Sequence, residues 1–252
     1  MKVSERKSQI LKLLEENQYL SVKRLAQLTY TSESSIRRDL AELQNQRLLM
    51  RTHGGAKRMQ SSLAVPPLAS RMAQNIVGKQ TIAKKAASLL GDHQIVMLDG
   101  SSTAGFLVPH IAKHRGIKLY TNNMQTALSA IDSGIMTVCI GGASADCSPV
   151  LSGTLACQNV ASVAPDILFF SSQSLDDEGM ISDSSEPENY LRSLMLRAAR
   201  KSVFLCDKEK FHRRSPYLLT CIRNVDHAIF DEPWEAHLGG TEDENHFIPK
   251  RL

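Results

Sequence analysis

Six short apolar runs alternate with stretches of helical periodicity from residue 71 onward, and this alternation constrains the fold more than any other feature. The runs span 95–99, 117–122, 136–142, 166–172, 202–207 and 227–231. The helical stretches span 79–90, 103–114, 124–132, 154–163 and 187–200. Strands buried on both faces and separated by helices are typical of a mostly parallel sheet covered by helices. The sequence therefore predicts an α/β domain over residues 71–236, followed by a loose tail over 237–252.

The first 60 residues have a different character, because they contain the whole basic excess of the chain. They carry 12 Lys and Arg against 6 Asp and Glu, whereas residues 61–252 carry 18 against 20. A basic module joined to a near-neutral body is typical of a protein that binds a polyanion. The segment 59–70, "MQSSLAVPPLAS", holds two prolines and several small residues, so we expect a linker there.

Three helices and a basic hairpin are expected within residues 1–58. A first helix fits 5–16, and a second begins after Ser21, which can cap it. A third follows in "TSESSIRRDLAEL", where Ser32 can accept hydrogen bonds from the first backbone amides. Its apolar residues recur on one face and leave its serines and arginines largely outside. "LLMRTHGGAKR" reads as two short strands or a strand and a glycine turn, and the whole pattern matches a winged helix-turn-helix.

The third helix and the hairpin supply the side chains that a reader of the DNA major groove needs. Small polar residues at the start of such a helix reach base edges, while arginines and the wing bind phosphates. On an ordinary solvated helix, Arg38 would instead pair with Asp39 or Glu42. RNA readers rely more on aromatic stacking than this segment allows, so we expect double-stranded DNA. The DNA-binding candidates are Ser32, Glu33, Ser34, Ser35, Arg37, Arg38, Arg51, His53 and Lys57.

A loop of small residues follows the first apolar run of the larger domain. In "IVMLDGSSTAGFL" a strand ends at Asp99, and Gly100 to Thr103 lead into a helix. Backbone amides and hydroxyls at a helix start can bind an anion, although a plain strand-to-helix turn gives the same pattern. Asp99 faces this loop and is a candidate for binding sugar hydroxyls.

Two motifs of the first part resemble the DeoR family of bacterial sugar-operon regulators. Residues 32–40 match its Ser-Glu-x-x-Ile-Arg-Arg-Asp-Leu helix, and residues 51–56 match its Arg-x-His-Gly-Gly-Ala wing. The resemblance extends over roughly 4–231. It departs from the family at Tyr30 and Thr31, where Gly and Val are usual, so a strained or altered turn is expected. In the larger domain Asp207 and Lys210 match, whereas Glu209 replaces a serine and Arg192 a lysine.

The resemblance implies a DNA-binding transcriptional regulator, in most cases a repressor, of a carbohydrate-utilisation operon. It implies a larger domain similar to ribose-phosphate isomerases, a phosphorylated sugar or polyol as effector, and a homodimer or higher homo-oligomer. The effector-binding candidates are Lys79, Asp99, Gly100, Ser101, Ser102, Thr103, Asn122, Gly141, Gly142 and Lys210.

The alternative is a sugar-phosphate isomerase that carries a DNA-binding module. That chemistry needs a positioned general base, and "SLDDEG" lacks the glycine-flanked pattern of the isomerases, so no enzyme activity is expected. His110 and His114 are four residues apart but have no evident third ligand, so we expect no metal and no cofactor. Five cysteines without a CxxC pair, and no apolar run of about 20 residues, indicate a reduced cytoplasmic protein without a membrane partner.

Overall fold

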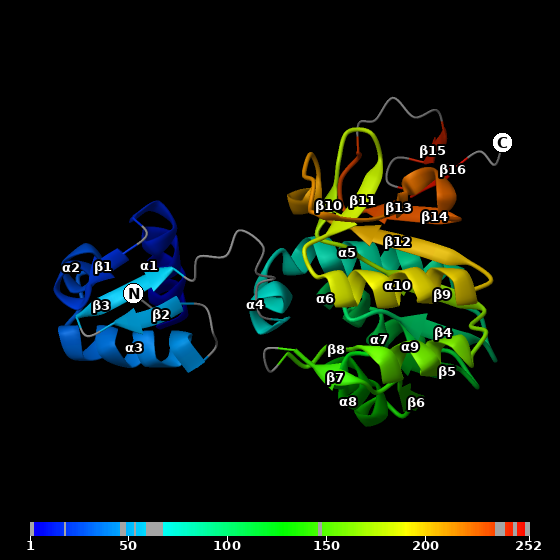
Figure 1. Ribbon diagram of the computed structural model, residues 1–252, viewed down its shortest axis with the longest axis horizontal. Helices are drawn as coiled ribbons and strands as arrows, with labels where there is room; N and C mark the ends of the chain where they lie inside the picture. Colours follow the sequence, from blue (N-terminus) through cyan, green and yellow to red (C-terminus); the bar gives the residue numbers. More distant parts are fainter. Residues whose placement is uncertain are drawn as a thin grey trace. The chain divides into compact units, whose positions relative to one another are not determined.

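A computed structural model of the protein (Figure 1) describes residues 3–17, 19–45, 49–52, 54–58, 68–145, 148–234, 240–243 and 246–249. Its internal contacts divide the chain into two compact units, Met1–Arg71 and Met72–Leu252, which we call the small unit and the large unit. Residues 59–67 of the expected linker lie outside the described residues, and 68–70 begin helix α4 (Leu68–Ala73).

The small unit packs three helices with a three-stranded antiparallel sheet (Figure 1), which is a winged helix-turn-helix. Its helices are α1 (Val3–Asn17), α2 (Val22–Leu28) and α3 (Glu33–Asn45). Its strands are β1 (Tyr19–Ser21), β2 (Leu49–Thr52) and β3 (Gly55–Arg58), in the order β1-β3-β2. Both predicted caps are confirmed. The hydroxyl of Ser21 accepts a hydrogen bond from Arg24 N at 3.1 Å, and that of Ser32 accepts one from Ser35 N at 3.3 Å.

The turn between α2 and α3 contains a left-handed residue, as the sequence led us to expect. Tyr30 has φ of 51°, and its side chain is 97% exposed. A bulky L-residue in this region is strained by roughly 1–2 kcal/mol. The turn therefore keeps the left-handed geometry for which glycine is better suited.

The large unit is built on an eight-stranded sheet with the order β15-β16-β14-β12-β9-β4-β5-β6. Six of these strands are parallel and coincide with the six apolar runs, which confirms the predicted α/β class. They are β4 (Ile95–Leu98), β5 (Lys118–Thr121), β6 (Met136–Cys139), β9 (Ile167–Phe170), β12 (Ser202–Cys206) and β14 (His227–Phe230).

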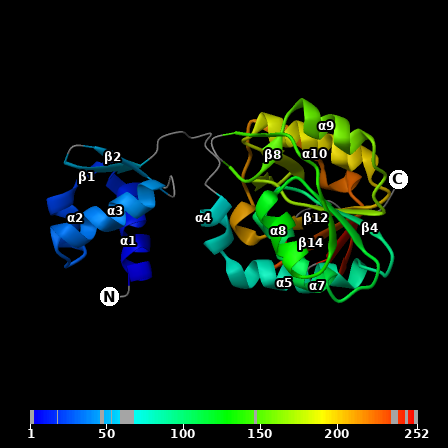
Figure 2. The same cartoon turned by 90° about the horizontal axis from the view of Figure 1, so that it is seen from below.

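Helices cover both faces of this sheet, and each face has its own apolar core (Figure 2). On one face lie α5 (Ile76–Ala86), α6 (Ser102–Gly105), α7 (Val108–Ile111) and α8 (Met124–Asp132). On the other lie α9 (Thr154–Ala161) and α10 (Glu186–Ala198). No helix in the described part of the chain has the length and apolar composition that a membrane span requires.

The single helix expected over 103–114 is divided into α6 and α7. Pro109 lies in the first turn of α7. Proline has no N–H for an internal helical hydrogen bond and its ring clashes with the preceding turn, so it is tolerated at a helix start but not in the interior. The chain therefore begins a new helix at Val108.

Several short antiparallel strands were not expected. Three form a small sheet, namely β10 (Ser174–Leu175), β11 (Met180–Asp183) and β13 (Tyr217–Cys221). Two form a hairpin, β7 (Ala143–Ser144) with β8 (Leu151–Ser152). Instead of an entirely loose tail, β15 (Gly240–Asp243) and β16 (His246–Pro249) extend the main sheet beside β14. Pairing of β16 satisfies backbone groups that an open β14 edge would expose.

Candidate functional site

The outer surface of α3 carries most of the predicted DNA-binding side chains. Ser34, Arg37 and Arg38 are exposed, whereas Ile36 and Leu40 on the inner face are fully buried. Ser32 and Glu33 are also exposed at the start of the helix, and Ser35 is half-buried. The amphipathic pattern thus places hydroxyl groups and guanidinium groups together at the N-terminal half of one exposed helix.

Two acidic residues of α3, Asp39 and Glu42, pair with α1 rather than with Arg38. The Asp39 side chain is buried and accepts a hydrogen bond from Arg6 Nε at 2.5 Å, and Glu42 pairs with Lys7. Arg38 consequently forms no ion pair within the described part of the chain. Among the residues that the structure describes, Arg37 pairs with Glu33 alone, at 3.1 Å and with both side chains exposed. Such an exposed pair is worth a few tenths of a kcal/mol and is easily exchanged for a phosphate.

The wing adds further positive charge. Arg51 on β2 and Lys57 on β3 are both exposed. The two strands pair directly, with Arg51 opposite Ala56. His53, the remaining wing candidate, lies outside the described residues. A basic hairpin beside an exposed helix of this kind can bind the phosphates that flank a major groove.

A second group of polar residues lies in the large unit where parallel strands end. Asp99 follows β4, Asn122 follows β5, Ser171 follows β9 and Asp207 follows β12. The strands β5 and β6 lie on one side of β4 in the sheet. The strands β9 and β12, which come later in the chain, lie on its other side. Open parallel sheets bind ligands at such a reversal of strand order, outside the carboxyl ends of the strands.

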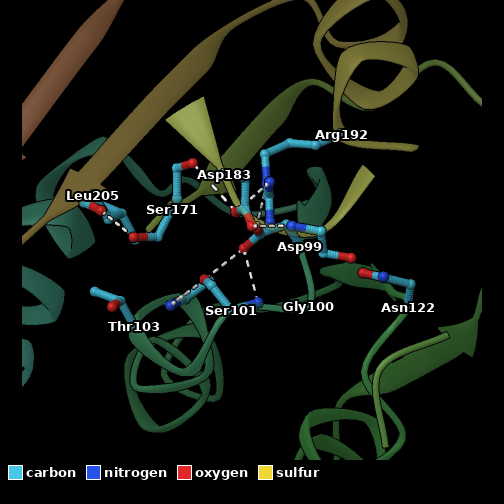
Figure 3. Close-up of polar contacts among 12 residues, drawn as sticks. Asp99, Gly100, Ser101, Thr103, Asn122, Ser171, Asp183, Arg192 and Leu205 are labelled. Carbon is cyan, nitrogen blue, oxygen red and sulfur yellow. Dashed lines mark hydrogen bonds and ion pairs between the residues drawn. The ribbon is translucent and has the colours of Figure 1, made fainter. Parts of the chain in front are cut away.

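A buried charged triad forms the centre of this group (Figure 3). Arg192 on α10 donates from Nε to Asp99 at 2.9 Å and from Nη1 to Asp183, the last residue of β11, at 3.0 Å. All three side chains are at most 4% exposed. The other Asp99 oxygen accepts hydrogen bonds from the hydroxyl and backbone N–H of Ser101, at 2.5 and 3.2 Å. Both oxygens of the carboxylate expected to bind sugar hydroxyls are therefore already engaged.

The carboxylates keep the guanidinium of Arg192 charged. Burial alone would lower its pKa, but the nearby charges of Asp183, Asp99 and Glu188 outweigh that effect and raise the pKa above its ordinary value. The triad joins the end of the main sheet to α10 and to the small sheet. Through Asp99, which also accepts from Ser101, it connects the loop after β4 to α10.

Lys210 connects the ends of β9 and β12 with helix α6. Its ammonium group donates to Ser171 Oγ at 2.7 Å and Thr103 Oγ1 at 3.3 Å, and it lies 3.3 Å from the Asp207 carboxylate. The side chain retains 18% exposure, more than any member of the triad. Lys210 thus combines a fixed position with access to solvent, which a ligand-binding cation requires.

Asn122 has unused bonding capacity. Its Nδ2 donates to Leu151 O at 2.7 Å, while its Oδ1 is buried without a hydrogen-bond partner in the described part of the chain. A Cβ on Gly100 would lie 2.3 Å from Val150 Cγ1 and 3.2 Å from Asn122 Nδ2, so the close packing requires glycine there. A buried amide oxygen without a donor is uncommon in native proteins, so Oδ1 is a candidate acceptor for a ligand hydroxyl.

The remaining effector candidates are engaged in contacts within the protein or are explained by the backbone conformation. Ser101 caps α6, with its hydroxyl accepting from Ala104 N at 3.1 Å, and Ser102 is buried beside it. Lys79 is buried on α5, where its Nζ donates to Gln74 O at 2.7 Å. Gly141 and Gly142 have φ of 80° and 117°, and a Cβ on Gly142 would lie 2.5 Å from Ser152 O. These glycines are explained by the backbone turn after β6.

Four residues of this group were not among the predicted site residues: Asp183, Arg192, Ser171 and Asp207. One signal for Arg192 was present in the sequence. It lies three residues after Asn189 and three before Met195, on the stripe of α10 that the structure buries. A charged residue on a buried helical stripe needs a partner of opposite charge.

The segment suggested for an isomerase base forms an exposed turn between β10 and β11. Asp176 accepts backbone hydrogen bonds from Glu178 and Met180, at 3.1 and 2.8 Å, and Asp177 and Glu178 are exposed. His114 Nδ1 lies 3.5 Å from the carboxylate of Asp92. The described residues contain no cluster of three potential metal ligands.

Comparisons with known families assign both units. Residues 6–62 match the DeoR-like helix-turn-helix domain, and residues 74–232 match the DeoR C terminal sensor domain. The chain belongs to the DeoR family. It is a DNA-binding transcriptional regulator of that family and not an enzyme.

Curated DeoR-family relatives match along nearly their whole length. The HTH-type transcriptional regulator GolR of Listeria innocua is 30% identical over 228 residues, 90% of each chain. The putative aga operon transcriptional repressor of Escherichia coli O157:H7 is 29% identical, covering 91% of this chain and 86% of the relative. The L-fucose operon activator of Escherichia coli K12 is 28% identical, covering 90% and 94%.

Solved structures similar to this DeoR-family chain share only the broad fold. Ribose 5-phosphate isomerase A from Methanocaldococcus jannaschii matches 55% of each chain at 15% identity and a TM-score of 0.42. The δ subunit of eIF2B from Chaetomium thermophilum covers 81% of this chain and 65% of its own, at 15% identity and a TM-score of 0.48. Similarity at this level gives no information about activity.

Proposed function

We propose that the protein represses a carbohydrate-utilisation operon in the cytoplasm, and that a phosphorylated sugar or polyol bound in the large unit modulates its affinity for operator DNA. The observation that carries the proposal is the group of polar residues at the strand-order reversal, where Lys210 is accessible and Asn122 Oδ1 lacks a donor. Curated relatives named for the aga and L-fucose operons support the carbohydrate assignment.

The effector would be held by charge and by hydroxyl contacts. A phosphate would lie beside Lys210, the N–H of Gly100, and the hydroxyls and backbone amides of Ser102 and Thr103. Ser101 would not contribute a donor, because its hydroxyl and N–H already donate to Asp99. A ligand hydroxyl would donate to Asn122 Oδ1, which removes the cost of a buried unpaired acceptor. Asp99 would contribute by fixing the loop through Ser101 and Arg192, not by direct contact.

A thermal-shift screen tests the effector proposal, because a ligand that binds only the folded state raises the melting temperature. The probes are glucose 6-phosphate, fructose 6-phosphate, galactitol 1-phosphate and glycerol 3-phosphate. Lys210→Gln should lose the shift given by any active probe. The matched control is Lys208→Gln, two residues away, whose ammonium group is half exposed and pairs with Glu232. An equal shift in wild type and Lys210→Gln would overturn this site.

DNA binding is tested separately with a duplex from the upstream region of the chain's own operon. Arg37→Ala with Arg38→Ala should nearly abolish binding and lower the salt dependence by about two counterions if both contact phosphates. Arg197→Ala with Arg200→Ala removes the same charge from the large unit and should leave affinity unchanged. Full affinity in the α3 double variant at matched salt would refute the assignment of α3 as the DNA-reading helix.

The chain would bind its operator as a homodimer or higher homo-oligomer. A single winged module contacts one half-site, and two-fold symmetric proteins read paired half-sites. This expectation follows from the presence of one such module in each chain, together with the DeoR-family assignment.

A further inference from the structure

An uncovered apolar surface lies at one edge of the main sheet. On α8, Met124, Leu128 and Ile131 are 40%, 63% and 56% exposed, and on β6 Met136 is 65% exposed. We call these four residues and Cys139 the β6-edge surface. The three α8 residues follow at intervals of four and three, so they lie on one side of the helix. Thr126, Ala127 and Ala130 form the buried side.

The strand beside this helix is an unprotected sheet edge. Among the described residues, β6 pairs only with β5, and α8 packs against it. Its sequence, Met136–Cys139, contains no charged residue and no proline. Sheet edges in monomeric proteins are normally shielded by charges, prolines, bulges or a covering segment, because the open backbone groups can pair with another strand. The opposite end of the sheet is extended by β15 and β16.

The size of the surface fits a contact between two protein chains. The exposed portions of the three α8 side chains amount to on the order of 300 Å², at the lower end of the range of the largest patch on typical monomers, which is often functional. Met136 adds apolar surface on the other side of the β6 edge, because its neighbour Thr137 is paired with Leu119 on the α8 side. A standard interface buries about 800 Å² on each partner, so the α8 side and the β6 edge together could form a large part of one.

We propose that the β6-edge surface binds the same surface of a second copy of this chain, related by a two-fold axis. A two-fold contact is self-complementary, so each copy would bury the apolar side of α8 and the β6 edge against its equivalent. The exposed part of α8 carries one ionisable side chain, Asp132. Beside Met136, Lys118 of β5 holds its ammonium group over the ring of Tyr120. Two like surfaces can therefore meet with little electrostatic repulsion. This inference rests on the proposed function in one respect, since it identifies the surface that pairs the two DNA-binding modules.

The test measures the mass of the full chain in solution, without DNA, by sedimentation equilibrium at micromolar concentration. The wild type should have at least twice the chain mass of 27.9 kDa. Leu128→Glu with Ile131→Glu should reduce the mass at least twofold, because both side chains are already more than half exposed and the charges would oppose each other across the axis. The control is Leu218→Glu, a 48%-exposed leucine of β13 in the small sheet, which should keep the wild-type mass.

Alkylation of Cys139, read by peptide mass spectrometry, gives a second measurement. This cysteine is exposed in the single chain, so it should react slowly in the wild type and faster in the α8 double variant. A wild-type mass of one chain overturns the proposal, as does an unchanged mass in a double variant that remains folded. Such a result would leave the DNA-binding proposal standing, because duplex binding is measured separately. If the double variant dissociates but the wild-type oligomer binds no duplex, the β6-edge surface is supported as the contact between copies and the proposed DNA-binding function is refuted.

Discussion

Replacement of Arg192 by methionine should strongly destabilise the large unit. Methionine keeps most of the aliphatic stem but removes the guanidinium that pairs with Asp99 at 2.9 Å and Asp183 at 3.0 Å. Removing one partner of a buried ion pair typically costs about 3–5 kcal/mol, because the other charge stays buried without compensation. Here two carboxylates, each at most 4% exposed, lose their common partner, so we expect a loss in the upper part of that range.

Urea unfolding followed by tryptophan fluorescence measures this loss. Trp234 is the single tryptophan of the chain, and it packs against Phe230 in the large unit, so the signal reports that unit. The control is Arg200→Met, an exposed arginine 3.6 Å from Asp166, which should cost less than about 1 kcal/mol. Arg192→Lys should be intermediate, because one ammonium group cannot reproduce the forked geometry of a guanidinium. A loss for Arg192→Met no larger than that of the control would refute the reasoning.

Three smaller changes test other parts of the structure. Gly55→Ala should destabilise the small unit by about 1–3 kcal/mol and weaken duplex binding, because the added Cβ would lie 2.2 Å from Leu20 O. The control is Gly54→Ala, which should be tolerated because its Cβ would have Tyr19 Oη as its nearest neighbour, at 3.8 Å. Burial raises the pKa of the Cys206 thiol, so native protein should resist iodoacetamide at that position while unfolded protein reacts, and equal rates would contradict this. Burial, and to a lesser extent the charge of Lys113, lowers the pKa of His110 below 6.5. Protonation therefore favours the unfolded chain, and the wild type should lose slightly more stability than His110→Gln as pH falls from about 7.5 to about 5.5, which paired urea titrations would measure.

The small unit could be predicted well from sequence because its determinants are local. The caps at Ser21 and Ser32 and the 3.6-residue period of α3 are contained within a few consecutive residues. The six parallel strands were predicted for a similar reason, since each is a continuous apolar run. The antiparallel strands β10, β11 and β13 were missed because they are short and contain serine or threonine, and because β13 pairs with β11 from far along the chain.

The charged centre of the large unit could not be predicted because its partners are brought together only by the fold. Arg192 and Asp99 are 93 residues apart in the chain. The sequence indicated Asp99 from its position after a strand, and the structure places it at the expected strand end. Its bonding state depends on α10 and on the small sheet, neither of which has a local signal near residue 99.

The bonding state of Asp99 changes where effector selectivity should be sought. A carboxylate whose two oxygens already accept from Ser101 and Arg192 would have to break a buried charge-assisted contact to accept a sugar hydroxyl. Asn122 Oδ1 has no such contact to lose. Lys210 can exchange its two neutral hydroxyl partners, Ser171 and Thr103, for a ligand phosphate while it keeps its contact with the Asp207 carboxylate. Differences in effector preference among variants of this chain should therefore follow substitutions at Asn122 and Lys210. Substitutions at Asp99 should act first on the stability of the large unit.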